Sequence, residues 1–195
     1  MKMLWVLLIV GLMAPAALAG IDPGTDSFGI YFDTAGNINC AVVGAFQPVP
    51  VYLVLMNPSG PTDGFECSVT LTGAPHFILA TSFNREFGPE PDGDWPASDF
   101  VRAAPSPLTV PANGAVVLVT MQVLLQAQEA LLFYIGPSSI PSMPGGLPVL
   151  TGNGVLRRGA VASGDVSLPV AGINAGNCPV GRESDSFGTV KSLFR

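Results

Sequence analysis

Short runs of β-prone residues, separated by Gly, Pro, Asn and Asp, recur along the chain after its first twenty residues. Apolar and polar residues alternate from Phe65 to Leu71, and this period of two predicts a strand with one buried face. The run from Val51 to Met56 is apolar on both faces, which is typical of a central strand in a sandwich. The chain therefore reads as a series of strands joined by turns.

Seven further runs complete this pattern, and together the runs predict an all-β chain: a single immunoglobulin-like antiparallel β-sandwich of about 8–9 strands. One alternative is a helix from Val123 to Phe133, whose leucines fit helical spacing although Gln128 interrupts the apolar face. The other predicted strands are Phe28 to Asp33, Ile38 to Val43, Phe77 to Phe83, Val116 to Leu124, Leu131 to Ile135, Val155 to Arg157 and Val166 to Ile173.

The N-terminus has the pattern of a cleaved signal peptide over residues 1–19. Lys2 precedes an apolar stretch, and Ala17 to Ala19 forms an A-x-A cleavage site. A membrane anchor is the alternative, but the apolar stretch is short for a span. We therefore expect an exported protein, periplasmic or extracellular, with a sandwich domain over residues 20–181 and a C-terminal tail over residues 182–195.

Composition narrows the class of protein. Of the 195 residues, 23 are Gly and 19 are Pro, 48% are hydrophobic and 11% are charged, with a net charge of −6. These values argue against coiled coils, helical bundles and disorder. Without a basic stripe, nucleic-acid binding is not expected. No second membrane span is expected, because polar residues interrupt the longest apolar stretch, Ala115 to Ile135.

Three cysteines, Cys40, Cys67 and Cys178, follow the predicted leader. Export to an oxidising compartment permits disulfides, and an odd number leaves one thiol over. We expect the pair Cys40–Cys67, because both lie in predicted strands, with Cys178 free or an alternative partner. Closing such a loop stabilises the fold by about 3–5 kcal/mol.

The loop over residues 86–99 is the densest acidic segment. Its Asp92, Asp94 and Asp99 are candidate ligands for calcium, which prefers carboxylate oxygens. Trp95 is a candidate for stacking on a sugar ring. The spacing is not that of an EF-hand, and a solvated loop that keeps the protein soluble is the favoured explanation. No other cofactor is expected.

No catalytic constellation emerges from the sequence. His76 is the single histidine, and no nucleophile motif accompanies it. Glu66 lies on the outer face of a predicted strand, where a carboxylate is ordinarily solvated and no partner can be named for glycoside hydrolysis. A second oxygen-rich stretch, Asp22 to Asn39, is explained by an Asx turn beginning at Asp33. The chain is therefore not expected to be an enzyme.

Several motifs resemble an uncharacterised family of exported bacterial β-rich proteins, and the resemblance spans most of the chain after the leader. It implies a secreted β-rich domain and assigns no functional residue. The tail resembles a Trp-Gly-x-Val-Lys-x-Leu-Tyr-Arg ending, with Phe in place of Trp and Tyr. The motifs are Tyr31 to Gly36 with Cys40, Tyr52 to Ser59, Gly64 to Cys67, Phe133 to Ser142, and Phe187 to Arg195.

These observations favour a non-catalytic exported β-sandwich with a structural or adhesion-like role. The alternative is a carbohydrate- or calcium-binding module that uses the acidic loop 86–99. The expected partner is a protein or a surface glycan. The tail from Glu183 to Arg195 combines apolar residues at helical spacing with basic residues, so we expect it to dock on the sandwich or on a neighbouring acidic surface.

Overall fold

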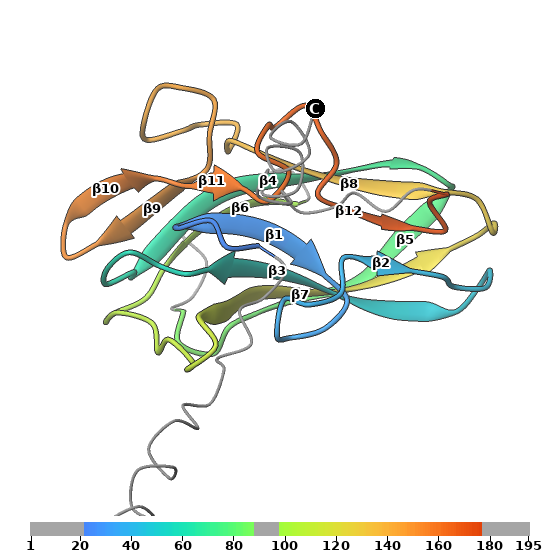
Figure 1. The fold of residues 1–195 in the computed structure, drawn as a ribbon, viewed down its shortest axis with the longest axis horizontal. Coiled ribbons are helices and arrows are strands. Elements are labelled where there is room, and N and C mark those ends of the chain that lie inside the picture. The colour runs from blue at the N-terminus through green and yellow to red at the C-terminus, as the bar shows by residue number, and fades with distance from the viewer. Residues whose placement is uncertain (1–21, 88–97, 177–195) are drawn as a thin grey trace, which may run out of the picture.

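The computed structural model describes residues 22–87 and 98–176, which form twelve β-strands in two sheets (Figure 1). The predicted leader and the tail lie outside these residues. The strands are β1 (Ser27–Tyr31), β2 (Cys40–Ala41), β3 (Pro48–Met56), β4 (Gly64–Gly73), β5 (His76–Phe83), β6 (Asp99–Ala103), β7 (Ala115–Leu125), β8 (Leu131–Gly136), β9 (Val149–Gly152), β10 (Val155–Arg158), β11 (Ala160–Val161) and β12 (Ala171–Ile173).

The first sheet, sheet A, has the strand order β11-β1-β3-β7-β5. Sheet B has the order β10-β9-β4-β8-β12-β2, and β6 also pairs with β4. Most neighbours are antiparallel, but β1 pairs with β11 and β12 pairs with β2 in parallel. The predicted all-β sandwich is confirmed, with mixed sheets and more strands than the expected 8–9.

One continuous apolar core fills the space between the sheets. Sheet A contributes residues such as Leu53 and Leu118, and sheet B contributes Phe65 and Phe133, all of them fully buried. The ring of Phe65 packs against Phe28 and Phe87, with centroid distances of 6.3 and 5.2 Å. These large side chains alternate with outward-facing residues, as a sandwich requires.

The predicted strands differ from the observed ones mainly in length. The helix considered for Val123 to Phe133 is absent, because β7 continues to Leu125 and β8 begins at Leu131. The predicted strand Ile38 to Val43 shortens to β2, and Val166 to Ile173 shortens to β12. The sequence pattern does not predict β6, β9 and β11. Strands β9 and β11 are very short and follow Pro148 and Gly159, and β6 carries the charged residues Asp99 and Arg102 among its five positions.

A polar network around Asp26 joins the entry of β1 in sheet A to β10 in sheet B. The Asp26 carboxylate accepts hydrogen bonds from the amide of Ser59 at 2.9 Å and from its hydroxyl. Arg157, on β10, donates from Nε to the same carboxylate at 3.3 Å. Arg157 also donates to the Thr62 hydroxyl and the Pro61 carbonyl. One carboxylate therefore fastens three separate segments.

This network predicts a defined dependence of stability on pH. Burial alone would raise the pKa of Asp26, but the hydrogen bonds from Ser59 and the guanidinium of Arg157 outweigh it and hold the pKa below its usual value. Because the folded pKa is lowered, the stabilisation is complete above about pH 4 and is lost as the pH falls through the folded pKa.

We predict that Asp26→Asn lowers the free energy of unfolding at pH 7 by about 1–2 kcal/mol, because it removes the charge. Asparagine also tolerates the positive φ of 52° at this position. Urea denaturation at pH 7 and pH 3 should show the difference from wild type narrowing at pH 3. The exposed Glu129, changed to Gln, is the matched control. An equal loss of stability at both pH values would contradict the assignment.

Candidate functional site

The five strands of sheet A contain no Asp, Glu, Lys or Arg. Strands of sheet B, in contrast, carry Glu66, Asp99, Arg102, Arg157 and Arg158. One face of sheet A packs on the core, and the other, its outer face, turns away from it. An antiparallel sheet with one solvated face ordinarily alternates apolar and polar residues, and charged side chains are usual on that face. The outer face of sheet A departs from this rule in that its strands carry no charged side chain.

Apolar side chains gather at one end of this outer face. The register places Pro48, Leu124 and Phe77 in one row across β3, β7 and β5. Phe46 donates its amide to the carbonyl of Leu125, next to this row. Leu79 sits at a β-bulge in β5. The exposed fractions are 68% for Phe46, 54% for Phe77 and 53% for Leu79. We call these five residues, Phe46, Pro48, Phe77, Leu79 and Leu124, the apolar patch.

The edge of sheet A beside the apolar patch is open along the described chain. Strand β5 pairs with β7 on one side, and no strand among residues 22–87 and 98–176 pairs with its other side. Its Ala80, Thr81 and Ser82 are exposed. An edge strand with neither charge nor proline presents unpaired backbone groups to other chains. The bulge at Leu79 is the one device on β5 that limits such pairing.

A turn covers the opposite end of the outer face. Tyr31, Val54 and Met56 are buried there as a second apolar cluster. The Asp33 carboxylate accepts hydrogen bonds from the amides of Asn37 and Ile38 at 2.9 and 2.8 Å, so it closes a wider turn than the predicted Asx turn, whose bond spans two residues. Gly36 has a φ of 73°, and a Cβ there would lie 2.8 Å from the sulfur of Met56. Glycine therefore lets the turn close over the cluster.

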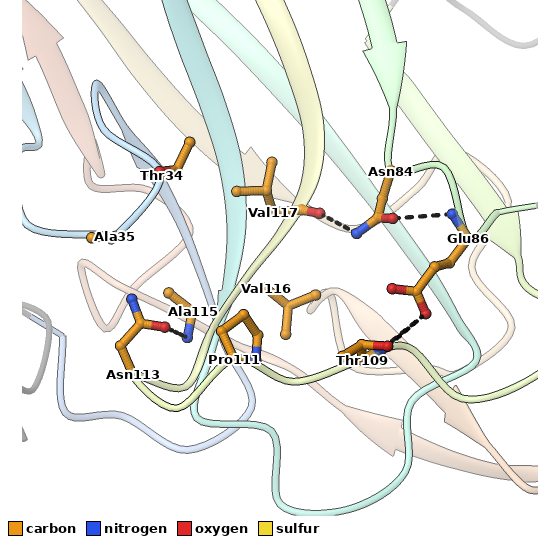
Figure 2. A pocket seen from close by; sticks show the side chains of 10 residues that line it. All are labelled: Thr34, Ala35, Asn84, Glu86, Thr109, Pro111, Asn113, Ala115, Val116 and Val117. Atoms are coloured by element: carbon orange, nitrogen blue, oxygen red, sulfur yellow. Dashed lines mark hydrogen bonds between the residues drawn. The ribbon is translucent and has the colours of Figure 1, made fainter.

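A pocket of about 460 Å³ opens between this turn and the segment that follows β5 (Figure 2). Its floor is the start of β7, at Ala115 and Val117, and Thr34 lies on the side of the turn. Asn84 and Glu86 form the opposite side. The pocket and the apolar patch therefore occupy opposite ends of β7, within one sheet.

Hydrogen bonds hold the polar wall of the pocket in place. Asn84 donates from Nδ2 to the Val117 carbonyl at 2.9 Å and accepts from the amide of Glu86 at 3.0 Å. Thr109 donates to Oε2 of Glu86 from its amide at 2.9 Å and from its hydroxyl at 3.3 Å. Figure 2 shows the other carboxylate oxygen of Glu86 directed toward the cavity. Thr109 thus fixes the Glu86 carboxylate through Oε2, and the other oxygen faces the cavity.

The predicted calcium loop is only partly described. Asp92, Asp94 and Trp95 lie outside the described residues. Asp99 is 8% exposed, and its Oδ2 accepts a hydrogen bond from the Ser139 amide at 3.0 Å. No group of three His, Cys, Asp or Glu residues that could hold a metal occurs within 22–87 and 98–176. Asp99 and Glu86 instead fasten different loops.

Glu66 does not have the solvated position expected for it. It lies on the outer face of β4, but it is 7% exposed, and its carboxylate accepts hydrogen bonds from the Ser142 amide at 2.8 Å and from the Ser142 hydroxyl. With Asp99, it fastens the connection between β8 and β9 to sheet B. Alternation predicted its face correctly, but the sequence did not show which loop covers it.

The expected Cys40–Cys67 disulfide is wrong. Cys67 is a free thiol, fully buried in the core, and burial, followed by the nearby Asp99 carboxylate, raises its pKa. Cys40 lies on β2 at the far edge of sheet B, beside β12. Cys178 lies outside the described residues.

The single histidine, His76, lies at the start of β5. Its Nδ1 is 2.8 Å from the carbonyl oxygen of Ala74, so the nearby backbone holds the ring in place.

No protein-family model and no curated protein matches the chain. A solved structure with a similar fold is the sixth cohesin of scaffoldin B from Acetivibrio cellulolyticus, in complex with a mutant Cel5 dockerin. The TM-score is 0.42 and the sequence identity 11%, over 76% of this chain and 98% of the cohesin chain. Across the described ranges, no helix is long and apolar enough to cross a membrane.

The anchoring of the connection between β8 and β9 by Glu66 can be tested directly. We predict that Glu66→Ala raises amide hydrogen exchange in the connection between β8 and β9 and lowers the free energy of unfolding by about 2 kcal/mol. Hydrogen exchange measured on peptides from this connection checks the result, with Glu129→Ala as the exposed control. Unchanged protection around Ser142 would show that the carboxylate does not anchor the loop.

Proposed function

We propose that this chain is an exported, non-catalytic β-sandwich that binds a protein partner through the outer face of sheet A, in an adhesion-like role. The apolar patch carries the proposal, because it concentrates three large exposed side chains on a sheet without charges. Contiguous apolar surface on a soluble domain marks interaction sites. Burying each such side chain contributes about 1.5–3 kcal/mol.

The contrast with sheet B supports this choice of face. There the chain covers its own outer face, with the connection between β8 and β9 fastened through Glu66 and Asp99. At the patch end of sheet A, no described segment plays the same part. Aromatic anchors such as Phe46 and Phe77 dominate binding energy at protein interfaces. The exposed patch therefore has the composition of an interface core.

The open edge of β5 favours a protein over a glycan as the partner. Its outer backbone N–H and C=O groups, with which no strand of the described ranges pairs, match those of another extended chain, which can add a strand to the sheet. The patch supplies exposed apolar area for the side chains of that chain. The alternative, a carbohydrate- or calcium-binding loop, has little support in its described part. Asp99 is buried and bonded to Ser139, which leaves Glu86 to present an oxygen, whereas calcium takes about six to eight oxygen ligands.

The partner can be sought directly in the native host. We predict that a photo-crosslinking amino acid at Ser82 gives one discrete protein adduct, whereas the same group at the exposed Thr70, on the outer face of sheet B, gives none. Combining this crosslinking variant with Phe77→Glu should lower the yield of the Ser82 adduct about tenfold, since the substitution places a charge in the interface core. Leu168→Glu, a change at a similarly exposed site outside the patch, is the control.

Three outcomes would contradict the proposal. One is equal adduct formation from Ser82 and Thr70. Another is a Ser82 adduct that survives Phe77→Glu while the thermal unfolding of that variant matches wild type. A glycan partner would leave both positions without a protein adduct, and it would also overturn the proposal.

We propose further that export is accompanied by a Cys40–Cys178 disulfide. Gly172 of β12 pairs with Cys40, and Asn174 exchanges side-chain hydrogen bonds with Val43 at 2.9 Å in each direction. Four residues after Asn174 span at most about 13 Å, which keeps Cys178 within reach of β2. The two thiols would lose two protons and two electrons to an oxidising disulfide catalyst of the compartment by thiol–disulfide exchange.

This pairing predicts a thiol count. The exported protein, denatured without reductant, should show one reactive thiol, and peptide mapping should place it at Cys67. Reduction should raise the count to three. In the native state Cys67 should resist alkylation, because its thiol is buried and its pKa is raised. A count of three before reduction, or mapping of the free thiol to Cys178, would contradict the pairing.

A further inference from the structure

The pocket at the start of β7 has the composition of a receptor for one cationic side chain. Of the described residues that line it, Glu86 alone is charged. Ala35, Pro111, Ala115 and Val117 give it apolar walls. Lysine and arginine side chains have the complementary form, an apolar stem that ends in a positive group.

We propose that this pocket receives an arginine or lysine side chain of the protein that docks on sheet A. The proposal rests on the function inferred above and names a contact within it. Thr109 already occupies Oε2 of Glu86 with two hydrogen bonds, and the second oxygen faces the cavity. A guanidinium or ammonium group at that oxygen would form a charge-assisted hydrogen bond, which is stronger than a bond between neutral groups.

The fixed carboxylate makes this contact stronger than a typical surface ion pair. Exposed ion pairs contribute little, in part because both side chains lose conformational freedom when they meet. Here Thr109 has already restricted Glu86, and Asn84 holds the backbone of Glu86 to β7. The ordering of one partner therefore precedes binding, which reduces the loss of entropy on association.

The pocket and the apolar patch are spaced for a single partner. Val117, in the pocket floor, and Leu124, in the patch, are seven residues apart on β7, or roughly 20 Å. A standard interface covers about 800 Å² on each partner, which is enough to include both. The patch would supply apolar contact, and the pocket would fix the position of the partner along the strand.

The test uses N-acetyl-arginine amide, with N-acetyl-citrulline amide as the neutral probe of nearly the same shape. We expect the arginine probe to shift the amide resonances of Thr34, Ala115 and Val117 in a saturable titration by NMR spectroscopy. Glu86→Gln should weaken its binding about tenfold, since glutamine can still accept from Thr109 but lacks the charge. The exposed Glu129, changed to Gln, should leave it unaltered.

Equal binding of the arginine and citrulline probes, or equal binding to wild type and Glu86→Gln, would overturn the inference. So would the absence of saturable shifts at the pocket. In the native host, Glu86→Gln should also weaken the Ser82 adduct. If the probe binds but this adduct is unaffected, the pocket takes a free organic cation and not a side chain of the partner, and the inference fails. Loss of the adduct on Phe77→Glu alone would leave the proposed function standing.

Discussion

The burial of a sheet without charges is the constraint on which the rest of the structure depends. The strands of sheet A carry no charged side chain on either face, although a two-layer sandwich covers only one of these faces. The fold covers the other face at one end, where the Asp33 turn closes over Tyr31 and Met56. At the opposite end Phe46 and Phe77 remain exposed. The candidate site is the part of this face that residues 22–87 and 98–176 leave exposed.

The carboxylates of the described chain mainly hold its loops together. Asp26 fastens the Ser59 loop, Asp33 fastens its own turn, and Glu66 fastens the connection between β8 and β9. Each accepts hydrogen bonds from backbone amides, which would otherwise be left without partners where loops cross a sheet. Several of these groups lie in the motifs that resemble the exported bacterial family. In this chain, residues of those motifs therefore hold loops in place through hydrogen bonds. Membership of that family stays a prediction.

Local pattern predicted those parts of the structure that depend on local sequence. The alternation in Phe65 to Leu71 identified β4, and Asp33 identified its turn. Asn153 and Gly154 both have positive φ values, 52° and 76°, and join β9 to β10 in a hairpin that an Asn-Gly pair could have indicated. What local pattern does not contain is the pairing of distant strands. The apolar patch depends on the rows that link β3, β7 and β5, which only the pairing of these strands creates. The sequence likewise does not show that β8 and β12 separate Cys67 on β4 from Cys40 on β2, so it predicts a disulfide that the fold does not contain.

Hydroxyl-radical footprinting gives the most direct test of the central claim, that the outer face of sheet A is occupied in the native host. Oxidation of Phe46, Phe77 and Tyr134 would be compared between the purified protein and the protein in place. Tyr134, half-exposed on the outer face of sheet B, is the internal reference. The account predicts strong protection of Phe46 and Phe77 in the host, with Tyr134 equally reactive in both states. Equal oxidation of Phe46 and Phe77 in both states would contradict it.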